Sequence, residues 1–407
     1  MSTESEPEFV NHEDAWRPPW PQSLVGAEDA LCAIFGNERV ERVGYDDDDE
    51  IYEEEPQLFV ARCHCRNIHA TIKIYSTHLP RYAHICNCTL CRVTYGGFGS
   101  FSVCMPETLM YRSIQKPHAE SFQRFDPPGT GREPPSRWFC RSCGAHHGHN
   151  DNQLKSRYLS FYVETALFDK KFWRWTGITF SQTTGDGGLS TWLPSVGGKE
   201  LIALNTLGSR ALRHNREVGW DGEERLLARC ACGGVSFVIP RPSWAGRINP
   251  LARHAVSPSD PDKWKAYLDF STDTRLTTSM PVTPWMLVPR LLLSPLVPDN
   301  LLLGTIRTYR SSTRETRGFC KVCGAAVFLK STDRCPPGGY EILNIAMGIL
   351  KAPEGVRAER WVTWRAGRPE GVEEGLQHDA ELTDAIVEAH KQWSIEKYGD
   401  APDFDII

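Results

Sequence analysis

The sequence WFCRSCGA at residues 138–145 returns as GFCKVCGA at residues 318–325, with both cysteines and the following glycine in the same places. Upstream of each lies an apolar run with a Cys-x-Cys pair, LFVARCHCRNIHATI at 58–72 and LLARCACGGVSFVI at 226–239. Such apolar runs are typical of strands. The chain therefore carries two copies of one cysteine framework on a mainly β background.

Each copy offers four cysteines in two short pairs, which is the ligand number and type that tetrahedral zinc prefers. Disulfides within such short loops would be strained, and a redox Cys-x-x-Cys needs no partner pair. An iron site with four cysteines has the same spacing and stays open as an alternative. We predict two structural zinc ions, one held by Cys63, Cys65, Cys140 and Cys143 and the other by Cys230, Cys232, Cys320 and Cys323.

A further cysteine cluster stands inside the first copy, in ICNCTLCRVTYGG at 85–97. Three thiolates this close repel one another unless a cation lies among them, so Cys86, Cys88 and Cys91 are predicted to bind a third zinc ion. Three protein ligands and one open position are typical of a catalytic zinc. The alternative is a third structural site completed by Cys104 or His84.

The second copy has lost this cluster. Its aligned segment is DFSTDTR at 269–275, in which Asp269, Ser271 and Thr274 replace the three cysteines. Hydroxyls and one carboxylate are poor ligands for a soft zinc site. The second copy is therefore predicted to keep its structural zinc and to lack the reactive one.

Composition limits the class of protein. The 407 residues are 40% hydrophobic and 24% charged, which fits a soluble chain of several domains. The most apolar stretch, 283–305, contains charges and prolines that a bilayer span would not tolerate, and residues 1–10 do not read as a secretory signal. We therefore expect no membrane partner and a cytoplasmic location, with the nucleus as the other option.

Charge is spread unevenly. Residues 1–56 hold 17 acidic and 3 basic side chains, a net of −14, which leaves +9 for residues 57–407. This composition predicts a disordered acidic leader. The predicted order is the leader at 1–56, a first domain at 57–195, a linker at 196–222, a second domain at 223–395 and a tail at 396–407. Helical spacing within 381–393 predicts a terminal helix on the second domain.

Two further features border the cysteine clusters. Arg92 follows Cys91 and could hold a substrate carboxylate as a bidentate partner, although arginines beside zinc turns often have structural roles. His146, His147 and His149 follow Cys143 and could shuttle protons, but we favour surface histidines.

Together these motifs resemble the glutathione-dependent formaldehyde-activating family, which includes centromere protein V, and the chain resembles a tandem two-copy member. The resemblance implies a zinc-stapled β-tent fold in each copy, with Cys63, Cys65, Cys140 and Cys143 on the structural ion and Cys86, Cys88 and Cys91 on the catalytic ion. This sequence departs from the family at Arg66, where the second copy keeps the usual glycine as Gly233.

The resemblance also implies an activity. Family members are carbon–sulfur lyases, named for joining glutathione to formaldehyde, so the expected partner is a small thiol such as glutathione or a thiol adduct. The alternative is a non-catalytic zinc scaffold, of the centromere protein V kind, that binds a partner or nucleic acid. The acidic leader and the lack of a Lys/Arg-rich tract argue against nucleic acid.

Overall fold

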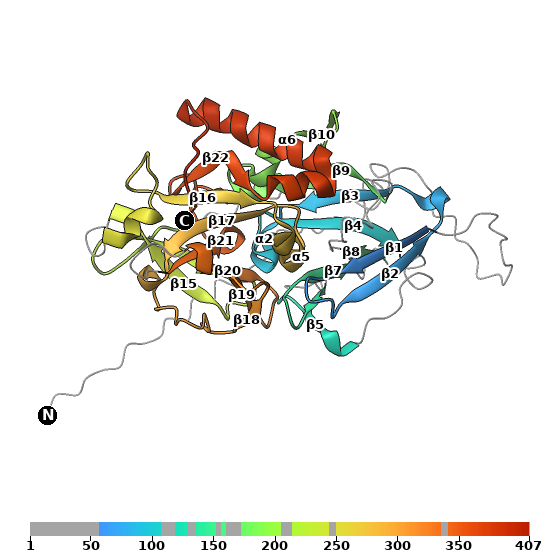
Figure 1. Cartoon of the computed structure of the whole chain (residues 1–407), viewed down its shortest axis with the longest axis horizontal. Coiled ribbons are helices and arrows are strands. Elements are labelled where there is room, and N and C mark those ends of the chain that lie inside the picture. The colour runs from blue at the N-terminus through green and yellow to red at the C-terminus, as the bar shows by residue number, and fades with distance from the viewer. Residues whose placement is uncertain are drawn as a thin grey trace.

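The computed structural model describes residues 57–106, 119–128, 136–151, 156–159, 172–204, 214–243, 250–334 and 341–406. The predicted acidic leader at 1–56 lies outside these ranges. Most of the regular structure is β, which confirms the mainly β prediction (Figure 1). No helix in the described ranges is both long enough and apolar enough to cross a bilayer.

The first half of the chain forms an eight-stranded sheet with the order β12-β9-β3-β4-β8-β7-β6-β5. β3 pairs in parallel with β9, and the other strands between β3 and β5 are antiparallel neighbours. The strand bounds are β3 Arg81–Cys86, β4 Ser100–Pro106, β5 Phe122–Phe125, β6 Arg137–Cys140, β7 His146–Asp151, β8 Ser156–Leu159, β9 Trp173–Thr179 and β12 Ile202–Leu204.

The second half forms a seven-stranded sheet with the order β18-β19-β20-β21-β17-β16-β22. Here β16 pairs in parallel with β22, and the remaining pairs are antiparallel. The strand bounds are β16 Trp264–Asp269, β17 Thr283–Pro289, β18 Ile306–Arg310, β19 Glu315–Cys320, β20 Ala326–Ser331, β21 Ile342–Ala346 and β22 Val362–Glu370.

Small sheets precede each large one. The bounds of their strands are β1 Gln57–Arg62, β2 His69–Ile74, β13 Glu217–Val218, β14 Glu224–Arg229 and β15 Ser236–Pro240. The Cys-x-Cys turns follow β1 and β14, each at the end of a hairpin strand. A short hairpin, β10 Ser195–Val196 with β11 Lys199–Glu200, lies between the halves in sequence. The predicted linker at 196–222 thus contributes β11, β12 and β13.

Three α-helices occur in the described ranges: α2 Thr89–Tyr95, α5 Thr272–Thr278 and α6 Val372–Tyr398. α6 confirms the predicted C-terminal helix and is longer than the stretch 381–393. It packs on β22, on β10 and on the 3-10 helix η5 Gly188–Trp192 (Figure 1). Trp192 is fully buried against Trp364, His390 and Trp393, so α6 covers residues from both halves of the chain.

The two halves meet through matching contacts near α2 and α5, which lie toward the middle of the molecule in Figure 1. Gly144 packs against the Phe319 ring, and Gly324 packs against the Phe139 ring. A Cβ atom at either glycine would come within 2.7 Å of the facing ring. Each half therefore offers the same glycine and the same phenylalanine to the other.

Gly324→Ala should test this contact. The φ angle of Gly324 is +78°, and a Cβ atom there would also meet His146 at 2.8 Å, so we expect a loss of about 2–3 kcal/mol in unfolding free energy. Gly399→Ala is the matched control, because Gly399 has the same φ and open space around it. Chemical denaturation measures both variants, and equal losses would contradict a tight interface at Gly324.

Candidate metal centres

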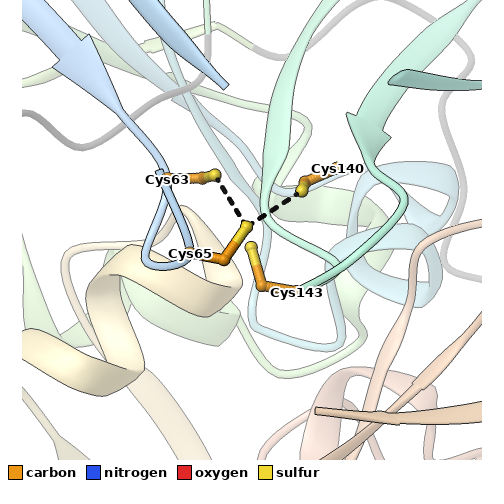
Figure 2. Close-up of side chains that lie close together, drawn as sticks. All are labelled: Cys63, Cys65, Cys140 and Cys143. Atoms are coloured by element: carbon orange, nitrogen blue, oxygen red, sulfur yellow. Dashed lines mark hydrogen bonds between the residues drawn. The ribbon is translucent and has the colours of Figure 1, made fainter. Parts of the chain in front are cut away.

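The first quartet is built from two turns far apart in sequence. Cys63 and Cys65 lie in the turn after β1, whereas Cys140 ends β6 and Cys143 lies in the turn before β7 (Figure 2). The Sγ atom of Cys65 is 3.5 Å from that of Cys63 and 3.5 Å from that of Cys140. Backbone N–H groups of Ile68 and Ser142 donate to Cys63 Sγ and Cys140 Sγ, each at 3.4 Å.

The second quartet repeats this geometry between the turn after β14 and the end of β19 with the turn that follows it. Cys232 Sγ lies 3.6 Å from Cys230 Sγ and 3.4 Å from Cys320 Sγ. Backbone N–H groups again donate to sulfur, from Val235 to Cys230 and from Val322 to Cys320, each at 3.4 Å.

Both quartets fit a tetrahedral zinc ion. Zinc–sulfur bonds of about 2.3 Å in a tetrahedron place the sulfur atoms about 3.8 Å apart. Within each quartet all four Sγ atoms lie within 4.8 Å of one another, and none of the eight cysteines forms a disulfide. The two predicted groups of four ligands are therefore brought together, and each could hold a metal ion such as zinc.

The third cluster forms where β3 passes into α2. Cys86 ends β3, Cys88 is the N-cap of α2 and Cys91 lies in its first turn, with the three Sγ atoms within 4.8 Å of one another. Cys88 Sγ accepts the Cys91 N–H at 3.4 Å, so one sulfur both caps the helix and faces the cluster. Among the described residues, this group contains three ligands, and His84 does not join it. The Cys104 side chain lies outside the described part.

Arg137 provides positive charge at this cluster. Its Nη2 group donates to Cys91 Sγ at 3.4 Å. The pKa of Cys91 lies well below its ordinary value because its sulfur accepts from the Cys86 and Cys88 thiols and lies beside Arg137. Burial lowers the pKa of Arg137, but Cys91, Tyr95, Cys88 and Cys86 together outweigh burial, and the net shift in the pKa is upward. No motif predicts a role for Arg137, although it stands three residues before Cys140, as Arg317 stands three residues before Cys320.

The histidines near the cluster are neutral at pH 7. Burial, with the Arg137 charge adding to it, lowers the pKa of His146 and that of His149 to about 3. His146 is 2% exposed, and its Nε2 faces the carbonyl oxygens of Thr94 and Gly324 at 3.0 and 3.2 Å. The expectation of a surface histidine is therefore wrong for His146, because the second half of the chain covers it.

Arg92 is buried beside α2. Its Nη1 donates to the Asn87 carbonyl oxygen at 2.7 Å, and its Nη2 donates to Thr89 Oγ1 at 3.2 Å. Arg275 repeats this pattern in the second half, with bonds to the Phe270 carbonyl oxygen and to Thr272 Oγ1. Both arginines thus fasten the start of a short helix, and the substrate-binding role of Arg92 stays a prediction.

Hydrogen bonds occupy the place of the cluster in the second half. Asp269 is 2% exposed, and its Oδ1 accepts the Ser271 N–H at 2.9 Å. Its Oδ2 accepts the Thr274 hydroxyl at 2.6 Å and the Trp285 indole N–H at 3.2 Å. The residues that replace Cys86, Cys88 and Cys91 are therefore joined directly to one another.

Position 66 keeps the backbone that its glycine counterpart has. The φ angle is +63° at Arg66 and +74° at Gly233. A left-handed conformation is cheap for glycine and strained for arginine, which is a physical reason for glycine at this turn.

Comparison with known proteins finds one family model that matches part of the chain. Residues 58–175 match the family model described as glutathione-dependent formaldehyde-activating enzyme. The match confirms the resemblance over this stretch, which contains the first quartet and the third cluster. No curated protein and no solved structure matches the chain.

Proposed function

We propose that this protein is a zinc-dependent enzyme that forms or breaks carbon–sulfur bonds at the cluster of Cys86, Cys88 and Cys91. The observation that carries the proposal is a three-thiol cluster that is separate from the two four-thiol clusters. This three-thiol cluster lies within the segment that matches an enzyme family. Four thiolates close a zinc site, whereas three leave a position for a ligand. On this proposal the quartets are structural, and the three-cysteine cluster, called the triad below, is the reactive site.

Zinc bound by the three cysteines would supply a Lewis acid beside which a thiol is held as thiolate near pH 7. The chain itself contributes one buried positive charge, because Arg137 lies against Cys91 and the nearby histidines are neutral. This positive charge favours the binding of an anionic thiol over that of a neutral thiol. Glutathione or its formaldehyde adduct is the proposed partner, in line with the description of the matching family.

We also propose that the second half is a degenerate copy of the first. The two large sheets follow corresponding orders: β5-β6-β7-β8-β4-β3-β9 matches β18-β19-β20-β21-β17-β16-β22. The two parallel pairs that correspond in these orders, β3 with β9 and β16 with β22, each carry a register shift. The reciprocal glycine–phenylalanine contacts fit two copies packed face to face. On this view the second copy supports the site and holds one structural zinc ion.

Zinc content and turnover of Cys88→Ser test the proposal together. Serine can still cap α2 through its hydroxyl, so the helix should persist while the triad loses a ligand. We expect three zinc ions per chain in the wild type and two in the variant, with thiol-dependent formaldehyde consumption falling to background. Elemental analysis and a formaldehyde assay with glutathione provide the readouts, and the far-UV circular dichroism spectrum controls for folding.

Two zinc ions in both proteins would overturn the proposal. That result would leave the triad without a firmly held ion, and the non-catalytic scaffold would become the better account of the quartets.

A further inference from the structure

Arg137 is a buried cation with unused donors. It is the first residue of β6, is 2% exposed and contacts Cys91 Sγ through Nη2. Within the described ranges, its Nε and Nη1 groups have no hydrogen-bond partner. A buried donor without an acceptor costs about 1–3 kcal/mol, so two on one side chain point to a ligand that is bound during function.

The second half contains the matched arginine with every donor group occupied. Arg317 stands three residues before Cys320, as Arg137 stands before Cys140. Its Nη1 donates to Thr274 Oγ1 at 3.0 Å, and Thr274 takes the place of Cys91. Its Nε donates to Ser311 Oγ at 3.0 Å, and its Nη2 donates to Glu315 Oε2 at 2.7 Å.

The comparison shows what has changed around the arginine. Glu315 stands two residues before Arg317, whereas Pro135 stands two residues before Arg137. The charge of Arg317 is therefore balanced by a carboxylate of its own strand. The charge of Arg137 faces thiolate sulfur instead, because proline takes the sequence position of that glutamate and Cys91 replaces the threonine.

The net charge at the triad explains why an arginine without a carboxylate partner is useful there. Three thiolates with one zinc ion sum to −1, and a substrate thiolate brings the sum to −2. Concentrated charge of one sign in a buried site is unfavourable unless an opposite charge lies in contact with it. Arg137 is such a charge.

We propose that Arg137 is the residue that binds the carbonyl oxygen of the substrate through its Nε and Nη1 groups, while Nη2 fixes Cys91 as a metal ligand. The inference rests on the proposed function and names the oxygen-binding group at the same site. The substrate class is a small aldehyde, whose oxygen gains negative charge during reaction with a thiolate.

The bond changes balance without a further reagent. The thiolate electron pair forms the carbon–sulfur bond, the π pair of the carbonyl moves to oxygen, and a proton from solvent then neutralises that oxygen. In reverse, the alcohol loses its proton, the carbonyl forms again and the thiolate leaves. In both directions the oxygen is most negative between the two steps, which is when two guanidinium donors stabilise it most.

The test compares Arg137→Gln, Arg137→Lys and Arg317→Gln in the full-length protein. Zinc affinity at the triad is measured by chelator competition, without substrate, and turnover of formaldehyde with glutathione is measured at saturating zinc. For Arg137→Gln we expect zinc affinity to fall 10–100-fold and kcat to fall about 100–1000-fold. Arg137→Lys keeps the charge and should recover part of both. Arg317→Gln should leave triad affinity and kcat unchanged.

Unchanged zinc affinity and unchanged kcat in Arg137→Gln would overturn the inference. Weaker zinc binding with normal kcat at saturating zinc would overturn the oxygen-binding role and leave a positioning role only. The two proposals fail separately, because a wild-type protein that binds only two zinc ions contradicts the proposed function, whereas failure in the Arg137 variants alone contradicts only this inference.

Discussion

Cys140→Ser is expected to remove one zinc ion and to lower the unfolding free energy by more than about 4 kcal/mol. Cys140 Sγ lies 3.5 Å from Cys65 Sγ, so the quartet ties the turn after β1 to the turn after β6. Zinc in sites of this kind contributes folding free energy directly, because a preformed site does not exist in the unfolded chain. Without the ion, several buried thiols would also be left close together.

Zinc analysis and thermal unfolding of Cys140→Ser measure this effect. Cys88→Ser is the matched control, since it should also lose one ion yet retain the wild-type unfolding temperature within a few degrees. A folded Cys140→Ser protein with wild-type stability would contradict a structural role for the first quartet.

Asp269→Ala is expected to destabilise the chain by about 3–5 kcal/mol. The substitution leaves three donors without their acceptor: the part-buried Ser271 N–H, the buried Thr274 hydroxyl and the buried Trp285 indole N–H. Each such donor costs about 1–3 kcal/mol, and partial rearrangement keeps the total below the sum of the three.

Asp269→Asn is the informative comparison. It keeps the shape of the side chain and one acceptor oxygen, so the expected loss is about 1–2 kcal/mol. Urea denaturation of both variants gives the values. A loss below 1 kcal/mol in Asp269→Ala would show that the hydrogen bonds do not replace a metal as the support of this turn.

The cysteine sites could be predicted from spacing because each ligand pair lies within a few residues. Cys63 and Cys65 are far in sequence from Cys140 and Cys143. The same two motifs recur in the second copy, and this repetition predicts that the two cysteine pairs bind one ion. The helices α2 and α5 escaped prediction because seven residues are too short for a helical period to show. The contact between Arg137 and Cys91 depends on how β6 lies against α2, which no local pattern encodes.

The burial of His146 could not be predicted for the same reason, since it depends on a contact between residues that are distant in sequence. Its burial comes from the Gly324 turn of the second half, which covers the ring. A histidine after a cysteine turn looks exposed when only its neighbours in sequence are considered.

The position of α6 has a consequence for how the chain folds during synthesis. Trp192 belongs to the first half, yet two of its ring neighbours, His390 and Trp393, lie on the last helix. The ribosome must therefore complete nearly the whole chain before the surroundings of Trp192 can close. Contacts between residues so distant in sequence slow folding and leave apolar surface exposed in the meantime. We therefore expect the nascent first half to keep the apolar surface around Trp192 exposed until α6 emerges.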